Sequence, residues 1–282
     1  MTTTLRPAAP ESRTAEGRRR RGYEICVNSR PVGAVDLLGP AGGGGPAFGR
    51  IDRLYIHEGE RRRGRGTVAA LAAEEVLRRW GCTHVEASVP VAADEDAPGV
   101  HLLTALGYTE RSRHRVKEVH SSPVLPAGTA ARPLSAAEFP AWWEGSAATY
   151  VDGLLGRGMD RDQAVARSEA TRLAQLPDGP ATEGVALRVL THDGADIGSL
   201  WLAFATLPRP GVNAWVFDVV VHPERRGEGH GRSLMLAAER ECLAVGARLL
   251  GLNVFTDNTR ASRLYTSLGY RTVERFHVKE LR

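Results

Sequence analysis

The chain has 282 residues, of which 42% are hydrophobic and 25% charged, and its formal net charge is +4. These values are typical of a globular protein with room for two domains, and they exclude fibrous and largely disordered classes. No apolar run approaches the ~18 residues that a membrane helix needs, and the first residues lack a secretory signal core. Three scattered cysteines form no metal-ligand spacing. We therefore expect a cytoplasmic protein with no membrane partner and no metal site.

The excess of basic residues is concentrated in two short segments. Arginines cluster at residues 18–21 and again at residues 61–65. Residues 1–22 show no hydrophobic periodicity, so we expect them to be a disordered basic leader. A tail that binds a polyanion is the alternative. The local origin of the charge makes nucleic acid an unexpected partner.

The first half of the chain predicts a small mixed domain. Residues 23–28 and 32–37 alternate around a turn, as the strands of a hairpin do. A flexible loop is expected at residues 42–45, and a strand at 50–56. Apolar residues then recur at helical spacing from Val68 to Trp80.

The second half follows a Pro- and Ser-containing segment that has the composition of a linker, at residues 119–129. A short strand is expected near residues 131–134, then helices at 136–155 and 160–176. Ser135 and Glu138 form a predicted capping box at the first of these helices. The remaining pattern predicts strands and helices alternating to the end of the chain, with strands at 186–190, 197–202, 214–221, 249–254 and 272–278 and a helix at 259–268.

One unit of sequence occurs twice. An apolar strand runs into a basic turn of the form Arg-x-x-Gly-x-Gly and then into a helix, and Leu-Gly-Tyr follows some 40 residues later. In the first copy the turn is residues 57–66, and in the second it is residues 222–231. Gly64 and Gly66 of the first turn correspond to Gly229 and Gly231 of the second. Such register over a whole supersecondary unit predicts two related domains.

A glycine turn at the start of a helix is a site for phosphate, because the first backbone N–H groups of the helix are unpaired and point outward. Two common classes of such site do not fit. A dinucleotide-binding Rossmann turn needs a third glycine, and a Walker loop needs Gly-Lys-Ser or Gly-Lys-Thr. Neither copy has these residues.

The second copy resembles the GNAT superfamily of acyl-CoA-dependent N-acetyltransferases. The resemblance rests on the turn at residues 222–232, on Asn258-x-x-Ala261-x-x-x-Tyr265, and on Leu-Gly-Tyr at residues 268–270. It covers residues 130–282 well and residues 23–118 as a degenerate copy. The implied fold is α/β, with two tandem GNAT-like domains, each a mixed twisted sheet flanked by helices. The domain bounds we expect are 1–22, 23–118, 119–129 and 130–282.

The resemblance also implies a cofactor and a chemistry. Acetyl-CoA would donate an acetyl group to an amine, with Tyr265 as general acid and Asp218 as base. Tyr265 could instead be an aromatic of the buried helix stripe, and Asp218 could instead pair with an arginine. The cofactor-binding residues implied are Val219, Val221, Arg226, Gly227, Gly229, His230, Gly231, Arg232 and Asn258.

The first copy keeps the turn and lacks the chemical groups. Leu103 stands at the position of Tyr265, Asp96 at that of Asn258, and Arg53 at that of Asp218. No segment precedes Tyr23 that could form the two helices expected to cover the acceptor. We therefore expect residues 23–118 to be a non-catalytic domain that is structural or binds coenzyme.

The acceptor is expected between the two helices of residues 136–176. Acidic and aromatic side chains there suit a cationic amine, and we take Glu144, Trp143, Tyr150 and Asp152 as substrate residues. A small basic molecule, such as an amine-bearing antibiotic, is the predicted acceptor. Alternatives are a protein lysine or N-terminus, and a non-catalytic acyl-CoA-binding regulator. The protein is expected to be a monomer or a homodimer.

Overall fold

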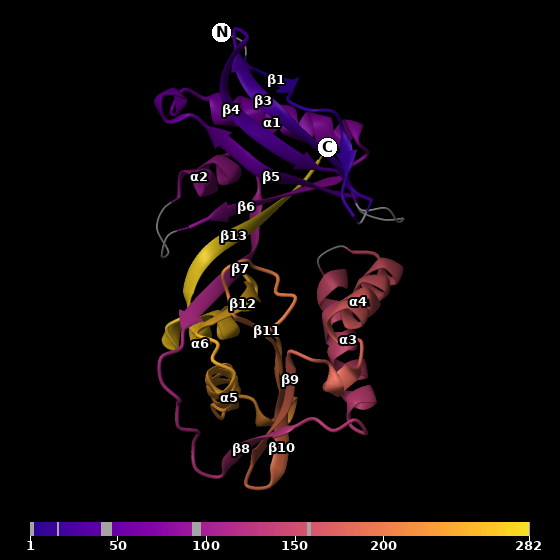
Figure 1. Cartoon of the computed structure of the whole chain (residues 1–282), viewed down its shortest axis with the longest axis vertical. Coiled ribbons are helices and arrows are strands. Elements are labelled where there is room, and N and C mark those ends of the chain that lie inside the picture. The colour runs from indigo at the N-terminus through magenta and orange to yellow at the C-terminus, as the bar shows by residue number, and fades with distance from the viewer. Residues whose placement is uncertain (1–2, 16, 41–46, 92–96, 157–158, 282) are drawn as a thin grey trace. The chain divides into compact units, whose positions relative to one another are not determined.

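The computed structural model describes residues 3–15, 17–40, 47–91, 97–156 and 159–281 (Figure 1). The chain forms two compact units, residues 1–112 with 274–282 (unit 1) and residues 113–273 (unit 2). It passes between them within strands β7 (Thr109–Glu118) and β13 (Arg271–Glu280). Each half of the sequence therefore supplies a strand to the unit built by the other half. The predicted loop at 42–45 and Asp96 lie outside the described residues.

Unit 1 is a mixed sheet whose strands run in the order β1-β3-β4-β5-β6-β13. Its pairs are antiparallel except β5 with β6. Helix α1 packs on this sheet, and apolar side chains of β3, β4 and α1 fill the core between them. The elements are β1 (Thr3–Pro7), β2 (Ser12–Arg13), β3 (Arg19–Val27), β4 (Arg30–Leu38), β5 (Phe48–Ile56), α1 (Arg65–Arg79), β6 (His84–Pro90) and α2 (Pro98–Ala105).

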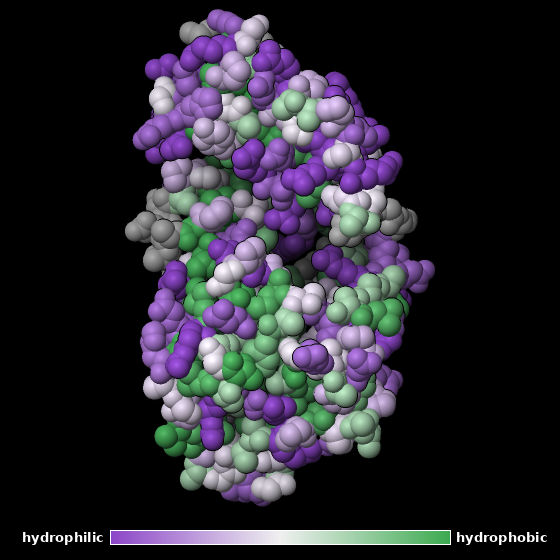
Figure 2. All heavy atoms as spheres, in the orientation of Figure 1, coloured by the Kyte–Doolittle hydropathy of each residue, from purple (hydrophilic) through white to green (hydrophobic). Residues whose placement is uncertain are grey.

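The segment expected to be a disordered leader contains strands. β1 pairs antiparallel with β3, and Arg18 and Arg19 of this segment have partners within unit 1. Arg18 donates from Nε to the carbonyl of Gly39 at 3.0 Å, and the Arg19 guanidinium lies 5.4 Å from the ring centre of Trp80. Main-chain pairing and cation–π contact thus fix a segment with little apolar content. Hydrophilic side chains predominate on the face of this unit seen in Figure 2.

Unit 2 is a second mixed sheet, with strands in the order β7-β12-β11-β10-β9-β8. Side chains alternate across it, so Leu200 and Leu202 pack with α5 while Trp201 packs with α3. Helices α3 and α4 therefore cover one face, and α5 and α6 the other (Figure 1). The elements are β8 (Thr129–Pro133), α3 (Phe139–Leu155), α4 (Arg161–Gln175), β9 (Val185–His192), β10 (Ala195–Ala203), β11 (Ala214–Val221), α5 (His230–Ala244), β12 (Leu249–Phe255) and α6 (Thr259–Ser267).

The predicted capping box is confirmed. Glu138 Oε2 accepts from the backbone N–H of Ser135 at 2.9 Å, and Ser135 Oγ accepts from the backbone N–H of Glu138 at 3.3 Å. Helix α3 begins at Phe139, directly after this box, three residues later than predicted. Short 3₁₀ turns at Glu58–Glu60, Gly179–Ala181 and Pro223–Arg225 were not predicted.

The two central strands of each sheet separate along their length. In unit 2, β11 pairs with β12 only from Ala214 to Val216, although it pairs with β10 as far as Val221. In unit 1, β5 pairs with β6 only over its first four residues. A bulge in β11 accompanies the separation: Trp201 and Leu202 of β10 face Asp218 and Val216, so Phe217 of β11 is the extra residue, and such a residue bends its strand.

A buried ion pair holds each exchanged strand to the helix of its unit. In unit 2, Lys117 Nζ of β7 lies 2.6 Å from Glu239 of α5. In unit 1, Lys279 Nζ of β13 lies 2.7 Å from Glu74 of α1. The four residues occupy equivalent positions in the two copies. Since each lysine comes from the other half of the sequence, both units depend on the whole chain.

Replacing Lys117 by Met leaves the Glu239 carboxylate, whose side chain is 5% exposed, without its cation. Removing one partner of a buried pair costs about 3–5 kcal/mol, so we expect a loss of that size in the free energy of unfolding, measured by urea titration. The control is Arg79→Met, which breaks an exposed pair with Glu75 and should cost about 1 kcal/mol or less. Equal losses in the two variants would contradict the assignment.

Candidate active site

The candidate site lies where β11 leaves β12. Asp218 of β11 is two residues past Val216, the last residue of β11 that pairs with β12. Its Oδ2 accepts from Ser146 Oγ at 2.7 Å. Burial raises the pKa of the Asp218 carboxyl, and the hydrogen bonds from Ser146 and from the backbone of Val219 oppose that rise. A desolvated carboxylate with a raised pKa is a better proton acceptor than an ordinary aspartate.

Ser146 belongs to a row of side chains on α3 that faces the same way. Trp143 and Tyr150 are three residues before it and four after it, so all three lie on one side of the helix. Two of the predicted substrate residues therefore share the helix face of Ser146, the residue that contacts Asp218. Ser146 itself was missed by the sequence reasoning, because its spacing from Trp143 and Tyr150 shows only a shared helix face and not the contact with Asp218.

Glu144 and Asp152 lie elsewhere on α3. Both side chains are exposed, and their positions two before and six after Ser146 place them on other faces of the helix. The structure does not bring these two predicted substrate residues to Asp218. The acidic character of this side of the site therefore comes from the strand and not from the helix.

Aromatic side chains pack beside Asp218. The rings of Trp201 and Phe217 stack with centres 4.8 Å apart, and Trp142 and Trp143 lie edge-on to Trp201 at 6.0 and 6.3 Å. Trp142 Nε1 donates to Ser199 Oγ at 3.0 Å, which fixes its orientation. This packing gives the acceptor side an apolar, rigid wall.

Tyr265 of α6 is 9% exposed and packs in the main core of unit 2. Burial, and then the negative charge of Asp218, raise the pKa of the Tyr265 hydroxyl to about 12. The Tyr265 hydroxyl is therefore mostly protonated at every pH below that value. The hydroxyl can donate a proton at neutral pH, as a general acid must.

The glycine turn has the shape of a phosphate cradle. Gly229 adopts φ 90°, a left-handed conformation that favours glycine, and α5 begins directly after it. No atom lies within 4 Å of where a Cβ on Gly229 would stand, whereas one on Gly231 would stand 3.3 Å from Leu264 Cδ2. Arg226 Nε donates to the carbonyl of Val221 at 3.2 Å, which folds the turn back on its strand. The open space beyond Gly229 faces the positive end of the helix.

The other predicted cofactor residues have contacts within the protein. The His230 side chain is buried against Glu228 and Arg225, so only its backbone can face a ligand. Arg232 donates to Ser267 Oγ at 2.6 Å, and Asn258 Oδ1 accepts from the N–H of Ala261 at 3.0 Å as the cap of α6. Val219 and Val221 are half-buried, and Gly227 is exposed at φ 99°. Arg260, which the sequence reasoning missed, lies close to Gly227.

Unit 1 reproduces this turn with different charges. Gly64 is left-handed at φ 70°, and Arg61 Nε donates to the carbonyl of Ile56 at 2.9 Å. An ionic cluster braces each turn at equivalent positions, and two of its charges are reversed between the copies, since Glu60 and Arg63 correspond to Arg225 and Glu228. Glu60 pairs with Arg63 and Arg65 in unit 1, and Arg225 pairs with Glu228 and contacts His230 in unit 2.

The chemical groups of unit 2 have no counterparts in unit 1. Arg53 pairs with Asp36 at 2.9 Å at the position of Asp218, and Leu103 lies in the core at the position of Tyr265. In the described part of the segment before β3 there are strands and no helices to match α3 and α4. Unit 2 is therefore the candidate catalytic unit.

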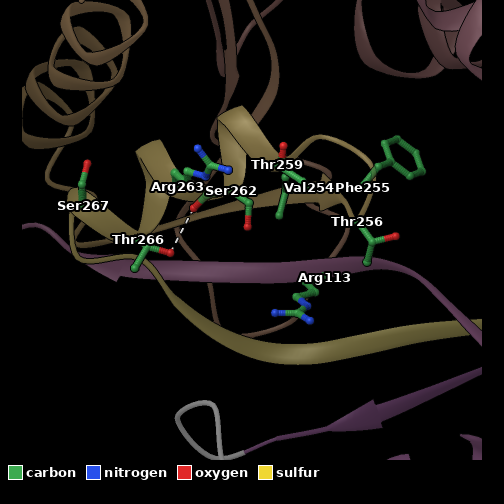
Figure 3. Close-up of a pocket in the computed structure, with 9 residues that line it drawn as sticks. All are labelled: Arg113, Val254, Phe255, Thr256, Thr259, Ser262, Arg263, Thr266 and Ser267. Atoms are coloured by element: carbon green, nitrogen blue, oxygen red, sulfur yellow. Dashed lines mark hydrogen bonds between the residues drawn. The ribbon is translucent and has the colours of Figure 1, made fainter.

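A cavity of about 500 Å³ lies on another side of α6 (Figure 3). Arg113 of β7, the end of β12 and the hydroxyls of Thr259, Ser262 and Thr266 line it. Neither Tyr265 nor any residue of the glycine turn does. In the described residues, no cluster of His, Cys, Asp and Glu could hold a metal ion, and no helix is long and apolar enough to cross a membrane.

Comparison with known proteins identifies the family. The family described as "Acetyltransferase (GNAT) family" matches residues 4–108 and 173–270. The chain belongs to this family. The two matched regions are the two copies found in the sequence, so this is a tandem GNAT protein with a degenerate first copy. Its family and its acetyltransferase relatives support N-acetyltransferase activity.

Its relatives include proteins named mycothiol acetyltransferase. That of Frankia casuarinae is 30% identical over 261 residues, covering 86% of this GNAT chain and 72% of its own. That of Kineococcus radiotolerans is 30% identical over 246 residues, covering 81% of this chain and 71% of its own. Among solved structures, a GCN5-related N-acetyltransferase from Sphaerobacter thermophilus superimposes with a TM-score of 0.61 at 19% identity, covering 93% of this chain and 81% of its own. A tandem GNAT protein from the clavulanic acid biosynthesis pathway superimposes with a TM-score of 0.53 at 24% identity, covering 93% of this chain and 83% of its own. These two structures confirm the fold.

Replacing Ser146 by Ala should raise the pKa of Asp218 further, because the hydroxyl stabilises the ionised carboxylate. The measurement is a pH titration of the Asp218 carboxyl carbon by NMR. In Thr149→Ala, which removes a hydroxyl bonded within the same helix, the titration should match the wild type. An unchanged pKa in Ser146→Ala would show that the hydrogen bond does not act on Asp218.

Proposed function

We propose that this protein transfers an acetyl group from acetyl-CoA to the primary amine of a small molecule, by direct attack of the amine in unit 2. The observation that supports this proposal most is that Asp218, on the strand that enters the glycine turn, is close enough to Tyr265 for its charge to raise the pKa of the Tyr265 hydroxyl. Asp218 has a raised pKa, and Tyr265 keeps its proton at neutral pH. A base and an acid with separated tasks are what such a transfer needs.

The glycine turn of unit 2 fits the pyrophosphate of acetyl-CoA. A side chain at Gly229 would fill the open space in front of the helix, and Arg226 and Arg260 are the cations beside the turn. Backbone N–H groups at the start of α5 would bind the phosphate oxygens. When bound there, acetyl-CoA supplies an activated thioester. His230, Arg232 and Asn258 would then act by shaping the turn and the start of α6.

The protein's own groups then move two protons and stabilise one charge. Asp218 accepts the proton of the substrate ammonium, directly or through water, because its raised pKa is closer to neutrality. Tyr265 donates its proton to the leaving sulfur. Following the family resemblance, the backbone of Val219 and Val221 would polarise the acetyl carbonyl.

The acceptor site would be walled by α3. Trp143 and Tyr150 lie on the side of this helix that carries Ser146, so an amine bound near Asp218 would meet aromatic surface. Glu144 and Asp152 would act only as distant charges. The relatives named mycothiol acetyltransferase favour a small-molecule acceptor over a protein lysine or N-terminus. An antibiotic acceptor, a cytoplasmic location and a monomeric or dimeric state are further parts of the proposal.

The direct test is release of free thiol from acetyl-CoA in the presence of amine panels. The panels comprise amino-sugar conjugates of amino acids, aminoglycosides, polyamines and lysine peptides. We expect release with one small-molecule class. Release with peptides alone would favour the protein acetyltransferase alternative, and coenzyme binding without release from any panel would favour a regulator.

Replacing Tyr265 by Phe should lower kcat by about 10²–10⁴-fold, the usual contribution of a general acid, and change KM little. Steady-state kinetics with the active amine checks this. The control is Tyr270→Phe, which removes a buried hydroxyl from the ring 5.8 Å away and should keep kcat near the wild-type value. A wild-type kcat in Tyr265→Phe would exclude the acid role.

Replacing Gly229 by Ala should weaken CoA binding about tenfold or more, because the new methyl group occupies the space that the phosphates need. Calorimetric titration with CoA measures this. Gly246→Ala is the matched control, since Gly246 is also left-handed with open space around it and lies at the far end of α5. Both variants should lose about 1–2 kcal/mol of stability, and Gly246→Ala should bind CoA normally. Equal affinity in both variants would place the coenzyme elsewhere.

A further inference from the structure

We propose that Arg115 is a positioning residue that holds α6, and so the hydroxyl of Tyr265, in place for proton transfer. Arg115 lies on β7, the strand that the first half of the sequence contributes to unit 2. This inference rests on the proposed function, because it assumes that Tyr265 is the acid. It assigns a role in the reaction to a segment outside the copy that carries the reacting groups.

Arg115 grips α6 through three hydrogen bonds. Its Nη1 donates to the carbonyl of Ser262 at 3.1 Å and to Thr266 Oγ1 at 2.8 Å, and its Nη2 donates to Ser262 Oγ at 3.1 Å. The Arg115 residue is 5% exposed. Hydrogen bonds from a buried charged donor are strong and directional. The planar guanidinium therefore fixes both the position of α6 along its axis and its rotation about that axis.

The side of α6 that Arg115 holds borders an open cavity. Ser262 and Thr266 also line the cavity of about 500 Å³ (Figure 3). Packed side chains therefore back only part of this helix face, and polar bonds from β7 supply much of the constraint. Tyr265 directly precedes Thr266, so a rotation of α6 at this turn displaces the Tyr265 hydroxyl.

The charge of Arg115 reaches Tyr265 as well. The Arg115 cation lowers the pKa of the Tyr265 hydroxyl, against the stronger effects of burial and of Asp218. Loss of the cation would make Tyr265 a weaker acid in addition to loosening it.

The degenerate copy lacks the same arrangement. In unit 1 the position of Tyr265 holds Leu103, the position of Ser262 holds Val100 on α2, and the position of Arg115 holds His277 on β13. Thr104 alone matches its counterpart, Thr266. Where the acid is missing, the arginine and the serine that would brace its helix are missing too. This argues for a role in the reaction beyond holding the fold, since both units need a stable helix there.

The test compares kinetics of the full chain in Arg115→Met, Arg115→Lys, Tyr265→Phe and the pair Ser262→Ala with Thr266→Val. We expect Arg115→Met to lower kcat about 10–100-fold, because small misplacements of reacting groups have effects of that size. KM for acetyl-CoA should change less than about threefold, because the glycine turn is untouched. Arg115→Lys should recover part of kcat, since it keeps the charge and loses the fork.

The paired variant removes the hydroxyl partners and leaves Arg115 in place, so it tests the grip even if Arg115→Met folds poorly. It should also lower kcat, and adding Arg115→Met to it should lower kcat by less than the product of the separate effects. His277→Gln, the equivalent change in unit 1, is the control and should keep kcat.

A wild-type kcat in Arg115→Met and in the paired variant, with Tyr265→Phe impaired, would overturn this inference and leave the proposed function standing. So would a loss in Arg115→Met that appears as a raised KM alone. A wild-type kcat in Tyr265→Phe would overturn the acid role itself, and the positioning role with it.

Discussion

The candidate site depends on one break in main-chain pairing, the end of the β11–β12 ladder after Val216. The extra residue Phe217 bends β11 at this point, and Gly198 of β10 permits the close approach of the two strands, since a Cβ there would stand 2.3 Å from the carbonyl oxygen of Val220. Beyond Val216, β11 continues through Asp218 to Val221 and into the glycine turn without pairing with β12. Unit 1 has the same break and the same close glycine contact at Gly33, so the two units share this scaffold although their chemical groups differ.

The exchange of β7 and β13 makes the two units interdependent. Each exchanged strand brings a lysine to a buried glutamate, and β7 also brings Arg115 to α6. A protein with one catalytic copy could lose the other copy if the two were independent domains. Here the degenerate copy supplies a strand to the sheet of unit 2, which gives a physical reason for keeping it whether or not its own glycine turn binds coenzyme.

Much of the fold could be predicted from the sequence, because it follows from local patterns. The capping box at Ser135, the glycine turns and the position of Tyr265 all rest on short spacings. Three features could not be predicted. The hydrophobic periodicity of β7 does not show which of the two sheets it joins, because the sheets are equivalent and either could accept the strand. Ser146 is one small residue in a helix, and its partner lies 72 positions away. The described part of the leader is held in place by main-chain pairing, and a hydrophobicity pattern does not reveal such pairing.

The central claim is that chemistry belongs to unit 2 although both units carry a glycine turn. The most direct measurement is the turnover of Gly64→Ala beside that of Gly229→Ala, with the active amine at saturating acetyl-CoA and again at low acetyl-CoA. Both glycines are left-handed with open space around them, so the two changes are matched. Loss of kcat/KM confined to Gly229→Ala is the result that we expect. An equal loss in Gly64→Ala would contradict the division of roles between the two units.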